Sequence, residues 1–274
     1  MFGISSLSLK GMELDRAIVE ASEAGFDVFE FVPQVFGSLK SYTSGVRQKL
    51  RKMFEEFEMV TIHTSDIKLG EGLPLDVASE DRFTREKSIE TYLDYIELAL
   101  DVGAQIASFH PSPKDKLATH CENPEPYLEF ADIALKHVNE ENLQLAYEFF
   151  DVDLIYTIAE SKFGLLFDVG HAASLFGGET TKGVLRLLKK ALPVTVELHL
   201  HGVDFTNTGL KIDHLPISKS RAINQLEVFK LITDTNFAGP LVFEIGIFRT
   251  GQANENLKYS VEAREKLLES LEIA

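Results

Sequence analysis

The feature of this sequence that most limits its fold is a regular alternation along the whole chain. Short apolar runs rich in β-branched and aromatic residues alternate with longer segments of helical periodicity. We predict strands at residues 2–7, 28–32, 59–63, 105–110, 143–149, 163–169, 194–200 and 241–245. We predict helices around residues 17–24, 46–57, 84–102, 126–138, 152–160, 182–191, 220–233 and 256–271.

Eight strand–helix units are the number that closes a parallel barrel. A doubly wound α/β sheet could use the same alternation, but it often carries a glycine-rich turn after its first strand. The turn at residues 5–9 contains no glycine. We therefore predict an α/β protein with a (β/α)8 TIM-barrel fold, in which residues 1–274 form a single domain.

The charge of the chain narrows the class of partner. The 43 acidic residues outnumber the 27 basic ones, which gives a formal net charge of −16. Such a field repels polyanions, so nucleic acid is a disfavoured partner. No apolar run is long enough to span a bilayer, and residues 1–11 do not resemble a signal peptide. We therefore predict no membrane association and a cytoplasmic location. Cys121 is the only cysteine, which excludes an intrachain disulfide and a cysteine-based zinc site.

Metal-ligand residue types recur near the ends of the predicted strands. The third to eighth strands carry, in chain order, His63, His110, Glu148, Asp168, His199 and Glu244. A carboxylate inside an apolar strand needs a partner, because an unpaired buried charge is costly. The strand ends of a barrel converge, and imidazole with carboxylate is a ligand set for zinc, manganese, iron or cobalt. One such residue could be structural, but six in succession favour a metal site. His120 and His137, in a predicted loop and helix, are interpreted as ordinary histidines.

Several short motifs, in this order and spacing, resemble the superfamily of xylose isomerase-like barrels. They are Ala24-Gly-Phe-Asp-Val-Phe-Glu30, Phe109-His-Pro111, Asp168-x-Gly-His171, His199-Leu-His201, Asp213-His-Leu-Pro216 and Glu244. That superfamily contains sugar and sugar-phosphate isomerases and epimerases, and also the endonuclease IV group of nucleases. The resemblance implies a central divalent metal, zinc or manganese, held by Glu148, Asp168, His199 and Glu244. It implies that a second ion, if one binds, uses His63 and His110, with Glu148 as the bridging ligand.

The resemblance departs from the nuclease pattern at one position. The nucleases hold a third ion with two histidines, matched here by His171 and His214, and an aspartate whose position is occupied by Ile212. An aliphatic side chain cannot ligate a cation, so a complete third site is not expected. His201 fits the isomerase-type pattern, although Gly202 replaces its acidic neighbour. His201 and His214 remain possible additional ligands.

The function that we predict is a metal-dependent sugar or sugar-phosphate isomerase or epimerase. The resemblance implies that Glu148 and Glu244 act as the catalytic acid and base, one removing a proton and the other returning one. His171 would orient a substrate oxygen. The predicted partner is a small carbohydrate or polyol, and a homo-oligomer is left open. Candidates for contact with a substrate phosphate are Lys68, Lys114, Lys211 and Arg249.

Two alternatives remain. The first is an endonuclease IV-like phosphodiesterase acting on abasic-site DNA, which the pair His63 and His110 favours and which Ile212 and the net charge of −16 oppose. The second is a metal-binding barrel without catalytic activity.

Overall fold

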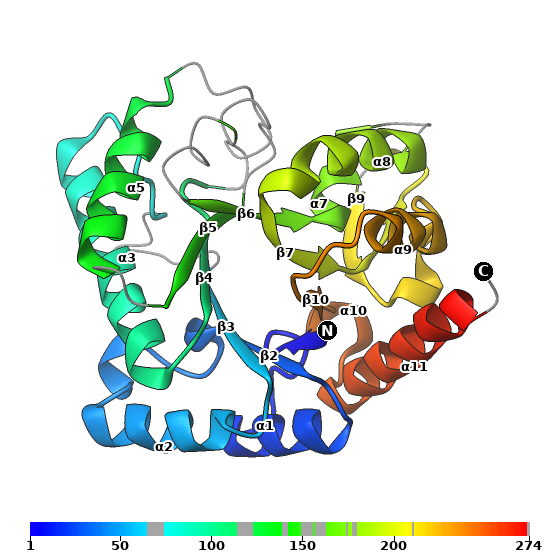
Figure 1. Ribbon diagram of the computed structural model, residues 1–274, viewed down its shortest axis with the longest axis horizontal. Coiled ribbons are helices and arrows are strands. Elements are labelled where there is room, and N and C mark those ends of the chain that lie inside the picture. Colours follow the sequence, from blue (N-terminus) through cyan, green and yellow to red (C-terminus); the bar gives the residue numbers. More distant parts are fainter. Residues whose placement is uncertain are drawn as a thin grey trace. The chain divides into compact units, whose positions relative to one another are not determined.

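A computed structural model of the chain describes residues 1–64, 74–113, 123–138, 142–148, 156, 163–173, 175–176, 180–209 and 211–272. Strands and helices alternate along these residues, as the sequence predicts (Figure 1). Apart from residue 156, the predicted helix at 152–160 lies outside them. The other predicted residues outside them are Lys68, Lys114, His120 and Cys121.

The predicted strands are all present in the described part of the chain. They are β1 Phe2–Ser5, β2 Val28–Phe31, β3 Met59–Thr64, β4 Ile106–Phe109, β5 Gln144–Glu148, β6 Gly164–Asp168, β7 Thr195–Leu200 and β10 Leu241–Phe243. Their order, β1-β10-β7-β6-β5-β4-β3-β2, is that of a closed barrel. For example, β1 pairs in parallel with β2 and β10, and β4 pairs in parallel with β3 and β5. The prediction of a (β/α)8 fold is confirmed.

The helices also follow the predicted pattern. The described α-helices are α1 Leu14–Glu23, α2 Ser44–Phe54, α3 Arg82–Val102, α5 Glu125–Val138, α7 Val169–Ala173, α8 Thr180–Ala191, α9 Gln225–Asp234, α10 Ile247–Thr250 and α11 Ala253–Glu272. Short 3-10 helices are η1 Pro33–Val35, η2 Leu39–Ser41, η4 Leu192–Val194 and η5 Ile217–Lys219. The longest helix, α3, begins where the Asp81 side chain accepts the N–H of Thr84, and it ends at Gly103, whose φ is 78°.

Four short α-helices and strands described in the C-terminal half were not predicted: α7, α10, β8 and β9. Helix α7 follows β6 without a connecting loop, and the strands β8 Gly202–Phe205 and β9 Lys211–Leu215 form an antiparallel pair. Each is only four or five residues long, which is too short for a hydrophobic period to be recognised.

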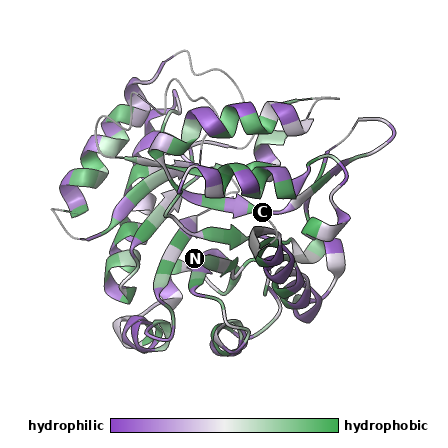
Figure 2. Ribbon diagram, turned by 45° about the vertical axis from the view of Figure 1, so that its right-hand side comes forward, coloured by the Kyte–Doolittle hydropathy of each residue, from purple (hydrophilic) through white to green (hydrophobic). Residues whose placement is uncertain are grey.

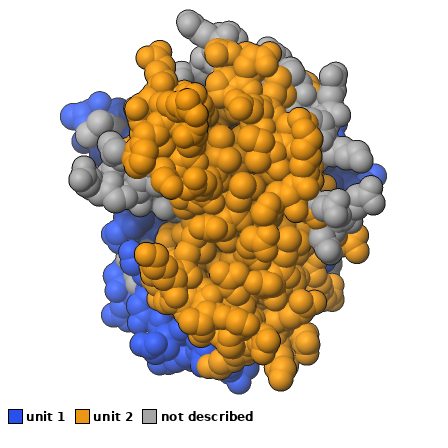
Figure 3. Space-filling model, turned by 90° about the vertical axis from the view of Figure 1, so that its left-hand side faces the viewer, with its two compact units in different colours: residues 1–30, 167–274 blue, residues 31–166 orange. Residues whose placement is uncertain are grey.

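The chain divides into two compact units, residues 1–30 with 167–274 and residues 31–166, which Figure 3 distinguishes by colour. In unit 1, α8 packs against α7 and α9, and the rings of Phe2 and Phe243 stack with their centroids 5.9 Å apart. In unit 2, α3 packs against α2 and α5, and Phe130 contacts Phe109 and Tyr147 in a buried aromatic core. Burial of each such ring contributes about 1.5–3 kcal/mol to folding. That residues 1–274 form a single domain stays a prediction.

The helices show hydrophobic residues on some faces and hydrophilic residues on others (Figure 2). Among the described residues, no helix combines the length and the apolar character that a membrane crossing requires.

Candidate metal centre

In unit 1, two carboxylates and an imidazole converge in the interior. Asp168 is the last residue of β6, His199 lies on β7, and Glu244 follows β10 directly. The backbone N–H of Glu244 donates to the carbonyl of Leu200 (3.2 Å), so the pairing of β10 with β7 places Glu244 beside His199. His199 Nδ1 lies 3.4 Å from Glu244 Oε2 and 3.8 Å from Asp168 Oδ2. We call these three residues the unit 1 cluster.

The unit 1 cluster fits a divalent cation. Its ligand atoms all lie within 4.8 Å of one another, and Glu244, the most accessible member, is only 3% exposed. Two carboxylates at this spacing and burial repel each other, and a cation between them removes both the repulsion and the cost of desolvation. Carboxylate oxygen with imidazole nitrogen is the donor chemistry that zinc and manganese accept.

His199 has a second carboxylate on its other ring nitrogen. His199 Nε2 lies 2.6 Å from Oε2 of Glu30, a fully buried residue of β2. Burial by itself lowers the pKa of His199, but the carboxylates of Glu30 and Glu244 outweigh it and raise that pKa well above its usual value. Glu197, two residues before His199 on β7, belongs to the same buried group.

Sequence reasoning did not assign Glu30 or Glu197 to the site. The sequence does contain a signal for both, because they are carboxylates inside predicted apolar strands, as Glu148 and Glu244 are.

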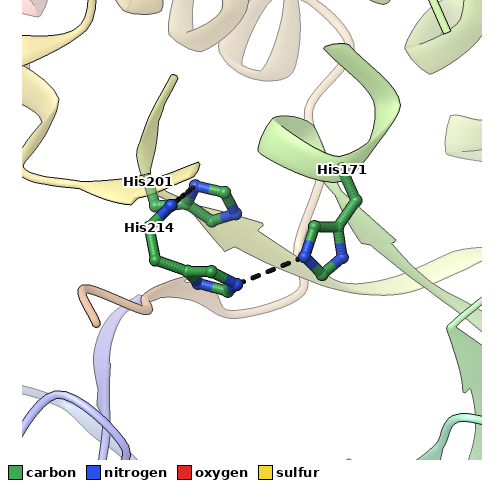
Figure 4. Close-up of side chains that lie close together, drawn as sticks. All are labelled: His171, His201 and His214. Atoms are coloured by element: carbon green, nitrogen blue, oxygen red, sulfur yellow. Dashed lines mark hydrogen bonds between the residues drawn. The ribbon is translucent and has the colours of Figure 1, made fainter. Parts of the chain in front are cut away.

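Three histidines lie beside the unit 1 cluster. His171 comes from α7, His201 follows β7, and His214 lies on β9. The rings of His201 and His214 stack with their centroids 4.2 Å apart, and His214 Nε2 points at His171 Nε2 over 3.2 Å (Figure 4). All three are buried, and their ligand atoms lie within 4.8 Å of one another.

The hydrogen bonds of His201 define which of its ring nitrogens carries the proton. The backbone N–H of His214 donates to His201 Nδ1 (2.9 Å), so this nitrogen presents a lone pair. The proton therefore lies on Nε2, which donates to Asp168 Oδ1 over 3.0 Å. His201 would have to give up one of these bonds to become a metal ligand.

His214 has the opposite arrangement. Its Nδ1 donates to the backbone carbonyl of Glu244 (3.1 Å), which leaves the lone pair of Nε2 facing His171. Burial, followed by the neighbouring ring of His201, lowers the pKa of His214 to about 3.

Local backbone features allow these rings to approach. Asp168 ends β6 and accepts the backbone N–H of His171 (2.5 Å), a bond that caps the first turn of α7. A Cβ atom on Gly170 would lie 1.9 Å from Cε1 of His201, so only glycine fits beneath that ring. A Cβ on Gly202 would lie 2.5 Å from the carbonyl of Pro216, which explains why no acidic side chain stands there. His214 has a φ of 51°, a conformation that non-glycine residues adopt only under constraint.

Lys211 and Arg249 are the two candidates for phosphate contact that the structure describes, and both pair with the same carboxylate. Lys211 Nζ lies 3.0 Å and Arg249 Nη2 lies 3.1 Å from the side chain of Asp213. Ile212, the predicted break in a third metal site, precedes this aspartate on β9. The positive charges of Lys211 and Arg249 are therefore partly neutralised inside the protein.

In unit 2, two imidazoles converge on one carboxylate. His63 lies on β3, His110 follows β4, and Glu148 ends β5. Glu148 Oε2 lies 2.6 Å from His110 Nε2 and 3.4 Å from His63 Nε2. The backbone of His110 accepts a hydrogen bond from the Tyr92 hydroxyl, and His63 Nδ1 lies 2.9 Å from Ser108 Oγ. We call His63, His110 and Glu148 the unit 2 cluster; its ligand atoms also lie within 4.8 Å of one another.

Comparison with known proteins places this chain in a family. The model of the xylose isomerase-like TIM barrel family matches residues 18–267. The chain belongs to this family. No sequence among the curated proteins matches it significantly.

Solved structures share the fold over nearly the whole chain. A D-tagatose 3-epimerase-like protein has a TM-score of 0.71 and 18% sequence identity, with 99% of this chain and 97% of that one covered. The IOLI protein, solved with a bound zinc atom, has a TM-score of 0.73 at 13% identity, with 97% of each chain covered. A xylose isomerase domain protein from Planctomyces limnophilus has a TM-score of 0.72 at 13% identity, covering 100% of this chain and 99% of that one. At these identities the likeness shows the fold.

In this member of the family, every residue predicted as a metal ligand or catalytic group is buried. Unit 1 brings together Asp168, His171, His199, His201, His214 and Glu244, and unit 2 brings together His63, His110 and Glu148. His137, interpreted as ordinary, lies on α5 in a partly exposed pair with Glu97 (2.6 Å).

Proposed function

We propose that this protein is a metal-dependent isomerase or epimerase of a sugar or sugar phosphate. The observation that carries the proposal is the convergence of Asp168, His199 and Glu244 in the interior of unit 1. We propose that Glu148 completes this set as the fourth ligand of a central zinc or manganese ion. Supporting likenesses are the epimerase-like protein and the zinc-bound protein described above.

When bound, the metal would act as a Lewis acid toward a substrate carbonyl and the hydroxyl beside it. Glu148 and Glu244 would then carry the proton, one removing it from the carbon between those oxygens and the other returning it. Contacts already orient both carboxylates: His110 and His63 hold Glu148, and His199 and His214 flank Glu244 at 3.4 and 3.3 Å. Burial strengthens these interactions because water is excluded from them. His171 would orient a substrate oxygen.

The unit 2 cluster supports the proposal of a second ion, held by His63, His110 and Glu148. Two imidazole Nε2 atoms and a carboxylate oxygen around one point form a three-donor set. Metal analysis tests this second site: a content of one ion per chain would mean that only the central site binds metal.

The runner-up is a phosphodiesterase acting on abasic-site DNA, a nuclease class that uses two or three ions. The close approach of His171 and His214 Nε2 favours it, since they match two ligands of a third ion. The net charge of −16 and the neutralised Lys211 and Arg249 oppose it. The third alternative is a barrel that binds metal but catalyses no reaction.

One experiment separates these proposals. The protein is purified without chelator, its metal content is measured, and it is assayed on ketoses, their phosphates, inososes and abasic-site DNA, with Glu244→Gln as the matched control. We expect exchange of a substrate carbon-bound proton with D2O, lost in the control. Salt-sensitive DNA binding with strand incision would replace the sugar proposal by the nuclease. Bound metal without any turnover would favour the non-catalytic barrel.

The small carbohydrate or polyol partner belongs to the same proposal. The homo-oligomer and the cytoplasmic location stay predictions.

A further inference from the structure

Glu30 is a fully buried carboxylate that touches a proposed ligand from the side opposite to the proposed metal. We propose that Glu30 is a positioning residue that selects Nδ1 of His199 as the metal-binding nitrogen. This inference rests on the proposed metal site, and it assigns a role to a residue that neither touches the substrate nor ligates the ion.

The position of the Glu30 carboxylate is defined by strand pairing. Glu30 lies opposite Ser5 in the parallel pair of β1 and β2, and its carbonyl accepts the N–H of Ser6 over 2.8 Å. The two side chains that meet, Glu30 and His199, are both fully buried. A site built on paired strands is held more accurately than one built on loops.

The hydrogen bond determines which nitrogen of His199 is available. At 2.6 Å, Nε2 donates to Oε2 of Glu30, because a carboxylate can only accept. The form of His199 that binds a metal is the neutral imidazole, and with its single proton on Nε2 its lone pair lies on Nδ1. That nitrogen faces Glu244 and Asp168, at 3.4 and 3.8 Å.

Without Glu30, the preference of the His199 proton for Nε2 over Nδ1 would be reversed. The proton would move to Nδ1, where Glu244 and Asp168 could both accept it, and the lone pair would then point away from them. Metal binding would first require breaking this arrangement. A carboxylate on the outer nitrogen of a metal-bound histidine orients the ring and raises its basicity, and its loss commonly costs 10–100-fold in metal affinity.

The first test compares two buried carboxylates of the same group. Zn²⁺ and Co²⁺ affinities are measured by competition with a chromophoric chelator for the wild type, Glu30→Gln and Glu197→Gln, and melting curves of the metal-free proteins check folding. We expect Glu30→Gln to bind each metal about 10–100-fold more weakly and to alter the visible Co²⁺ spectrum. Glu197→Gln, which removes the same charge, should lose several-fold less. Equal losses in the two variants overturn the inference, because the charge alone would then explain them.

The second test asks whether Glu30 acts through His199. In a His199→Asn background the Glu30→Gln change should cause no further loss of affinity, since the bond is already absent. The same loss in both backgrounds contradicts the inference.

A third measurement needs no variant and does not depend on folding of a mutant. In Zn²⁺-loaded wild type labelled with ¹⁵N-histidine, we expect NMR to show His199 protonated at Nε2 and metal-bound at Nδ1. Metal bound through Nε2 overturns the role of Glu30. A wild type that binds no metal at all defeats the proposed function instead, so the two failures are distinguishable.

Discussion

The clusters in the two units use the same ligand types but differ in how firmly those ligands are held. In the unit 1 cluster, His199 is bonded to Glu30, and Asp168 accepts from the ring of His201 and the backbone of His171. In the unit 2 cluster, His63 contacts Ser108, whereas Nδ1 of His110 is buried without a hydrogen-bond partner among the described residues. Hydrogen bonds behind the ligands reduce the reorganisation that metal binding requires. We therefore expect the central ion, held by the unit 1 cluster with Glu148 as the proposed fourth ligand, to be the tighter and catalytically essential one, and the second ion at His63 and His110 to be the weaker one.

The largest expected effect is the loss of Glu244, the proposed acid or base of the unit 1 cluster. Glu244→Gln keeps the size of the side chain but removes both its proton transfer and a charged metal ligand, so kcat measured at saturating metal should fall about 10²–10⁴-fold. The measurement is the rate of substrate proton exchange in D2O, with circular dichroism as the check on folding. His63→Gln, in the unit 2 cluster, should have a clearly smaller effect on kcat. Equal losses would remove the distinction between the two clusters.

The second prediction concerns metal affinity. Chelator titration of the metal-loaded protein should resolve a tightly and a weakly bound class of ion, whose affinities differ by about 10–100-fold. The reason is that hydrogen bonds support Asp168 and His199 from behind, whereas Nδ1 of His110 has no such bond among the described residues. His110→Ala should abolish the weak class and leave the tight class in place. If His110→Ala instead removes the tight class, the ranking of the clusters is reversed.

A third prediction tests the packing behind Asp168. Gly170→Ala should destabilise the protein by about 1–3 kcal/mol, because its Cβ would overlap the ring of His201. It should also weaken metal binding, since His201 would no longer hold Asp168. Urea unfolding and chelator titration measure these effects. Gly45→Ala in α2 is the matched control: a Cβ there meets nothing within 4 Å, so its stability should be unchanged or slightly higher.

The fourth prediction is a pH dependence of stability that arises from His214 in unit 1. The folded-state pKa of His214 is about 3, against an ordinary value of 6.5. Below pH 6.5 the unfolded chain binds a proton that the folded chain does not, so the free energy of unfolding falls as the pH decreases toward about 3. His199, whose pKa is raised, acts in the opposite direction: its contribution is lost as the pH rises above 6.5.

Replacing His214 by glutamine removes the first contribution. Urea titrations of the metal-free protein below pH 6.5 should show a slope of stability against pH that is lower by up to ~1.4 kcal/mol per pH unit. Identical slopes in the wild type and the variant would mean that His214 is not buried in its neutral form.

The eight strands could be predicted from apolar runs and hydrophobic periodicity, and all of their ends lie within two residues of the predicted ones. The ligand candidates Glu148, Asp168 and Glu244 could also be predicted from the sequence, because a charged residue in an apolar strand is exceptional. Glu30 carried the same signal and was missed, since its role depends on facing His199, which lies 169 residues away.

The sequence by itself determined the alternation that closes a barrel, the acidic charge and the supply of histidines and carboxylates at strand ends. These are local properties, readable from hydrophobic period and residue type. Only the tertiary structure decided that Glu30 contacts the outer nitrogen of His199, that His201 holds Asp168, and that the ring of His201 needs glycine at position 170. Hydrogen-bond direction depends on the three-dimensional positions of two atoms, and no spacing along a chain encodes it. In this protein, tertiary packing therefore decides which buried residue faces the proposed metal and which one positions a ligand from behind.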